Sequence, residues 1–106
     1  MRYLMITKPS DQRPDEKLFA EMAKFVEELT AAGILLATGG LAPTGVTVTS
    51  VGDEITVTDG PFAESKEAAA GFALVEVTSQ EEAIELTRRF RRIVGDGESV
   101  IQEVFG

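Results

Sequence analysis

Apolar residues recur along this chain with two periods, and their order predicts its secondary structure. Between Leu18 and Leu29 they recur every three to four positions, and Gly33 follows as a cap, which predicts a first helix. A second helix is predicted to begin at the capping box Ser79-Gln80-Glu81-Glu82 and to end near Gly95. Both helices carry charged residues on the side away from their apolar stripe.

The shorter apolar stretches predict strands. Four of them are apolar on both faces, at residues 3–7, 34–41, 72–77 and 100–105. Two more, at 46–49 and 55–58, alternate Val or Ile with Thr and flank Gly52-Asp53-Glu54, which predicts a hairpin. We expect its Val and Ile face to be buried and its Thr face to be wet or to line a site.

The predicted order is strand-helix-strand, hairpin, strand-helix-strand within one domain of residues 1–106. Two split β-α-β halves with an inserted hairpin indicate the α+β class, a ferredoxin-like βαβ–hairpin–βαβ sandwich. Two helices cover only one face of such a sheet, although its strands are apolar on both. A second copy, packed sheet against sheet, would cover the other face, so we expect a homodimer of the dimeric α+β barrel type.

Composition narrows the chemistry. The formal net charge is −8, from 18 acidic and 10 basic residues, which disfavours nucleic acid and anionic membrane surfaces as partners. Cys and His are both absent, so thiol nucleophiles, zinc-thiolate sites and a Ser-His-Asp triad are excluded. No stretch approaches the about 20 apolar residues of a membrane span, and a cytoplasmic protein is expected. We expect no metal and no cofactor, although a carboxylate-only magnesium or manganese site stays open.

One predicted loop combines a Gly-Pro pair, an aromatic residue and four charged side chains within nine positions. It is the segment Asp59-Gly60-Pro61-Phe62-Ala63-Glu64-Ser65-Lys66-Glu67. Gly-Pro is a stiff turn, and Pro61 lacks the amide hydrogen to which a preceding Asp often bonds. A carboxylate beside an ammonium is a workable acid-base pair when partly buried. The candidate catalytic residues are therefore Asp59, Glu64 and Lys66, and the candidate ligand-binding residues add Phe62 and Glu67. The alternative is a rigid connector in which Asp59 caps, Phe62 fills the core and the other charges lie at the surface.

Two further positions complete the candidate binding residues. Tyr3 and Met5 lie on the first predicted strand, where they belong to the core or line a cavity between two packed sheets. Tyr3 is the only phenol available for proton transfer. The basic cluster Arg88-Arg89-Phe90-Arg91-Arg92 complements a helix C-terminus, with Glu85 pairing Arg88 and Arg89; the alternative is a site for a phosphate, an acidic partner or a sigma factor.

The run Thr58-Asp59-Gly60-Pro61-Phe62-Ala63-Glu64-Ser65-Lys66-Glu67 resembles the signature of the YCII-related, or DGPF-domain, family. The opening Arg2-Tyr3-Leu4-Met5 and the segment Gly39-Gly40-Leu41-Ala42-Pro43 resemble it too, so the resemblance covers the whole chain. It implies a dimeric α+β barrel. Some members resemble small cofactor-independent enzymes, and others accompany sigma factors, so the resemblance implies association with a sigma factor. The His-Asp pair of the YCII branch does not carry over, because this chain has no His.

Two functions of different classes follow. The first is a small-molecule-binding or regulatory homodimer, whose ligand would be small and apolar or of mixed polarity. The second is a small cofactor-independent enzyme, of the isomerase, lyase or oxygenase type, that uses carboxylate and Lys acid-base groups. The absence of His, Cys and a metal-ligand cluster favours the first.

Overall fold

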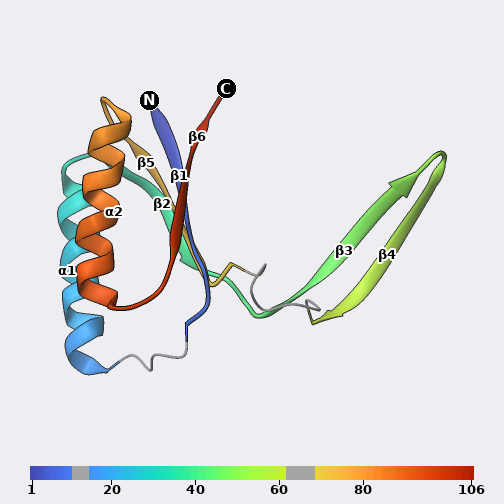
Figure 1. The fold of residues 1–106 in the computed structure, drawn as a ribbon, viewed down its shortest axis with the longest axis horizontal. Coiled ribbons are helices and arrows are strands. Elements are labelled where there is room, and N and C mark those ends of the chain that lie inside the picture. Colours follow the sequence, from blue (N-terminus) through green and yellow to red (C-terminus); the bar gives the residue numbers. More distant parts are fainter. Residues whose placement is uncertain (11–14, 62–68) are drawn as a thin grey trace.

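The computed structural model describes residues 1–10, 15–61 and 69–106, and these residues form an α+β fold (Figure 1). A four-stranded antiparallel sheet has the order β2-β5-β1-β6, and a separate two-stranded sheet pairs β3 with β4. The elements in chain order are β1 (Arg2–Thr7), α1 (Glu16–Ala31), β2 (Leu35–Gly40), β3 (Thr44–Val51), β4 (Glu54–Pro61), β5 (Gly71–Glu76), α2 (Gln80–Val94) and β6 (Ser99–Val104). This confirms the predicted ferredoxin-like order with a hairpin between its halves.

Both helices cover the same face of the four-stranded sheet (Figure 1). Tyr3, Val75 and Val77 form one buried cluster with Ala83 of α2. Because side chains alternate along a strand, the residues between them point to the opposite face, which neither helix covers. That uncovered face, here called the open face, carries the half-buried or exposed side chains of Leu4, Ile6, Phe72, Leu74, Val100 and Val104.

Local sequence signals explain where the helices begin and end. The Asp15 carboxylate accepts a hydrogen bond from the Leu18 amide at 2.8 Å, which caps α1. Gly33 follows α1 with a φ of 74°, as the predicted cap requires. At α2, the Ser79 hydroxyl accepts from the Glu82 amide at 3.1 Å, but the Glu82 carboxylate reaches back to Thr78 instead of Ser79.

The Thr78 contacts make acid stability depend on Glu82. Hydrogen bonds from the Thr78 hydroxyl and the Thr78 amide lower the pKa of Glu82 below its ordinary value of 4.5. A carboxyl whose pKa is depressed by folding stabilises the protein above its unfolded pKa, and this stability is lost as the pH falls through the folded pKa. We therefore expect Glu82→Gln to flatten the fall in unfolding free energy below about pH 4.5. Urea titrations at several pH values would show this, and Glu81→Gln, at the exposed neighbouring position, should keep the wild-type slope.

The hairpin of β3 and β4, here called the arm, projects away from the sheet and the helices (Figure 1). Val46, Val48, Ile55 and Val57 share one face of it and are 56% to 70% exposed. The expectation that this face is buried is wrong for the single chain. The arm also explains why the radius of gyration is 15.9 Å, since a compact chain of this length has about 13 Å.

The basic cluster of α2 pairs mainly within the fold. Arg88 pairs with Glu85, as expected, but Arg89 pairs with Glu28 of α1 at 2.8 Å and lies over the Phe25 ring. Arg91 donates to the Gly95 carbonyl at 2.7 Å and so fixes the turn into β6. These contacts support the interpretation of the cluster as a helix C-terminus.

Candidate ligand-binding cavity

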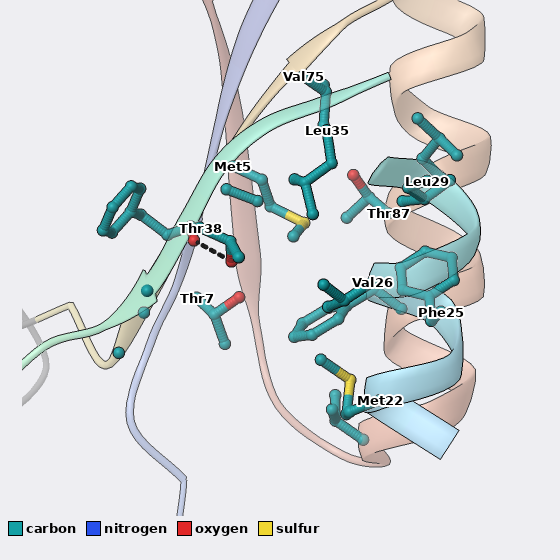
Figure 2. Close-up of a pocket in the computed structure, with 18 of the residues that line it drawn as sticks. Met5, Thr7, Met22, Phe25, Val26, Leu29, Leu35, Thr38, Val75 and Thr87 are labelled. Carbon is teal, nitrogen blue, oxygen red and sulfur yellow. Dashed lines mark hydrogen bonds between the residues drawn. The ribbon is translucent and has the colours of Figure 1, made fainter. Parts of the chain in front are cut away.

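A cavity of about 520 Å³ lies between α1 and the helix-covered face of the sheet (Figure 2). Met22, Phe25, Val26 and Leu29 line it from α1. The sheet contributes side chains such as Met5, Leu35 and Ile101, and α2 contributes Ala83, Leu86, Thr87 and Phe90. A volume of this size is typical of a site for a small molecule.

Small side chains explain why the two layers leave this space. On the sheet side the wall includes Gly40, Gly71 and Ala73, which reach little or not at all toward the helices. The large residues Phe25, Leu29 and Phe90 pack together instead, as one buried cluster between the helices. At the rim, Phe19 of α1 is 61% exposed. The helices and the sheet are therefore in contact at their buried clusters, and the cavity lies where only small side chains separate them.

Among the described residues that line the cavity, the polar side chains are those of Thr7, Thr38 and Thr87. Thr38 donates to the Phe72 carbonyl at 2.9 Å, which Figure 2 draws as a dashed line, and Thr87 donates to the Ala83 carbonyl at 2.8 Å. Thr7 shares a hydrogen bond of 3.1 Å with Ser99. Among the described residues that line the cavity, none carries an ionisable side chain.

The structure separates the candidate residues of the first strand. Met5 lines the cavity, whereas Tyr3 packs at the other end of the sheet against Val75, Val77 and Ala83 and is 3% exposed. Both face the helices: Tyr3 lies in the core, which is the first of the two expected alternatives, and Met5 lines a cavity between the helices and the sheet instead of one between two sheets. Burial, and then the charge of Glu103, raises the pKa of the Tyr3 phenol, which therefore keeps its proton at neutral pH.

Asp59 lies on the arm, exposed and opposite Val46, and does not line the cavity. Phe62, Glu64, Lys66 and Glu67 lie outside the described residues. Ala70 and Gly71 border the cavity. In the described part of the chain, no three carboxylates gather as a metal site would require.

The cavity-lining residues of α1, together with Thr38 and Thr87, were not predicted as a site. Periodicity placed the α1 residues on an inward face, but it does not distinguish a packed wall from the wall of a cavity. The usable signal was weaker, a Thr within each of two otherwise apolar inward faces.

None of the helices in the described ranges is long and apolar enough to cross a membrane.

Comparison with known proteins agrees with this architecture. The profile of the YCII-related domain family matches residues 1–104. An uncharacterised protein of Rhizobium meliloti (strain 1021) is 40% identical over 85 residues, a match that spans 77% of this chain and 64% of that protein. The solved structure of 5-chloro-2-hydroxyhydroquinone dehydrochlorinase from Burkholderia phenoliruptrix AC1100, in complex with 2,5-dihydroxybenzoquinone, superposes with a TM-score of 0.55. The match covers 99% of this chain and 94% of the dehydrochlorinase chain at 17% sequence identity, and it shows a likeness of fold.

Proposed function

This chain belongs to the YCII-related domain family, and from its own geometry we propose that it binds a small, uncharged, largely apolar molecule in the cavity between α1 and the sheet. The observation that carries this proposal is an apolar space of about 520 Å³ with three hydroxyls on its wall. Ligand sites in proteins combine these features, an apolar lining and a few placed polar groups.

The electrostatics of the cavity favour a neutral ligand. An ion moved from water into an apolar space loses its hydration, and this cost is large unless a charge of opposite sign or several hydrogen bonds replace it. No described residue of the lining offers such a charge. The net charge of −8 adds a repulsive field for anions around the whole protein.

Narrowing the cavity should weaken binding. Val26 lines it from α1, and Val26→Phe would place a ring in the space that the ligand needs. We expect the affinity for an apolar probe such as naphthalene to fall by about tenfold, which corresponds to about 1.4 kcal/mol. Equilibrium dialysis would measure it. Val51→Phe is the matched control, since Val51 is exposed on the arm, and equal affinities for the two variants would contradict the cavity as the site.

We also propose that the binding unit is a homodimer. The open face and the apolar face of the arm are two uncovered apolar surfaces on one chain, and the arm points away from its own sheet (Figure 1). Patches of several hundred Å² mark interaction sites, and a two-stranded hairpin alone has marginal stability. In a two-fold dimer, the same surfaces of both copies would be covered at once.

A second candidate function uses the motif loop. If Asp59 acts with Glu64 and Lys66, the chain is a cofactor-independent enzyme, and its fold is one that a dehydrochlorinase also has. Asp59→Asn distinguishes the two functions: we expect probe affinity to stay at the wild-type value, because Asp59 is not at the cavity. Loss of a turnover found by substrate screening would support the enzyme instead.

Association with a sigma factor and a cytoplasmic location stay predictions.

A further inference from the structure

The three Thr hydroxyls of the cavity differ in what they offer a ligand. A hydroxyl has one hydrogen to donate and two lone pairs that accept. Thr38 and Thr87 have given their hydrogens to the carbonyls of Phe72 and Ala83, at 2.9 Å and 2.8 Å. Their oxygens keep free accepting capacity on the cavity wall. Both threonines are therefore acceptors toward a ligand.

Two backbone donors near the rim, the amides of Leu41 and Ala70, are engaged as well. The Ala70 amide donates to the Thr7 carbonyl at 2.7 Å, and the Leu41 amide donates to the Ala70 carbonyl at 2.8 Å. The Thr7 and Ser99 hydroxyls share one bond in which either oxygen is the donor, so among the three described threonines of the cavity only Thr7 has a hydrogen that is not assigned.

From this arrangement we infer that the ligand is a hydrogen-bond donor: an uncharged aromatic or alicyclic molecule with a hydroxyl group, of the phenol class. A phenol donates its hydrogen to an accepting oxygen and leaves its ring to the apolar wall formed by Met5, Met22 and Phe25. A carboxylate or phosphate only accepts, so at Thr38 and Thr87 it would meet accepting oxygens, and none of the described lining residues offers it a cation. This inference rests on the proposed function, because it assumes that the cavity is the binding site.

Three probes of one ring system test the inference: 2-naphthol, naphthalene and 2-naphthoate. Their own fluorescence reports the bound fraction in equilibrium dialysis, since the chain has no Trp and one Tyr. We expect 2-naphthol to bind roughly fivefold more tightly than naphthalene, the effect of one net hydrogen bond, and 2-naphthoate to bind least. If 2-naphthol binds no more tightly than naphthalene, or if 2-naphthoate binds most tightly, the inference is wrong while the cavity remains the site. If none of the three binds, the proposed function itself fails.

Variants assign the preference to the two oxygens. Thr38→Val and Thr87→Val remove one acceptor each and keep the branched shape. The double variant should therefore bind 2-naphthol and naphthalene with equal affinity. Its affinity for naphthalene should be that of the wild type. Thr38→Ser with Thr87→Ser restores both oxygens and should restore the fivefold preference, which separates an acceptor from a purely structural role. Thr47→Val, on the exposed arm, should change nothing. A preference that survives in the double Val variant would overturn the assignment. If circular dichroism shows that the double variant is unfolded, Thr38→Val, at an exposed strand position, and Thr87→Val are measured singly, and the assignment is wrong if neither lowers the preference.

Discussion

Replacing Phe90 with alanine is expected to lower the free energy of unfolding by about 3 kcal/mol, the lower end of the range for a buried Phe. Phe90 is 9% exposed and forms a buried cluster with Phe25 and Leu29, which holds α2 against α1. The lower end applies because one side of this cluster borders the cavity, so fewer contacts are lost. A domain has only about 5–15 kcal/mol of stability, so the loss would be large.

Urea unfolding, followed by circular dichroism at one fixed protein concentration, would measure this loss. Phe105→Ala is the matched control, because Phe105 is 86% exposed beyond the end of β6. Its effect should stay within about 0.5 kcal/mol, as for most surface substitutions. Equal losses for the two variants would mean that the Phe90 cluster does not hold the helices together.

The periodic patterns predicted the elements well, because they depend on local signals. The α1 stripe, the Gly33 cap and the Ser79 cap each occur where the sequence placed them. The α2 capping box shows the limit of such signals, since Glu82 bonds to Thr78, one residue earlier than the pattern specifies. Similarly, the pair of Arg89 and Glu28 joins two helices, and no spacing within one helix could predict it.

The site was predicted less well, for a physical reason. A strand that is apolar on both faces gives no sign of which face the helices cover, and so the sequence left Tyr3 and Met5 open between the core and a cavity between two sheets. Alternation in the arm identified the residues that share a face, but what covers that face depends on the rest of the assembly. A cavity depends on the packing of whole layers, and a local pattern does not report it.

A charged residue on the open face should weaken the association of two copies of the chain. Leu74 lies at its centre, between Leu4 of β1 and Ala37 of β2. In the proposed dimer, Leu74→Glu would bury a carboxylate without a partner in both copies, at a cost of several kcal/mol each. We expect the wild type to sediment as a dimer at micromolar concentration and the Leu74→Glu affinity to fall at least about 100-fold, or about 2.7 kcal/mol.

Two further variants make the result specific to a surface. Thr49→Glu adds the same charge to the polar face of the arm and should leave the dimer intact, because that face has no apolar patch to cover. Val48→Glu adds it to the apolar face and reports whether the arm takes part. Circular dichroism confirms that each variant is folded, which we expect for Leu74→Glu because Leu74 is only half-buried in the single chain. A monomeric wild type would refute the homodimer. A Leu74→Glu dimer as tight as the wild type would exclude the open face, and the arm would then be the surface that joins the two copies.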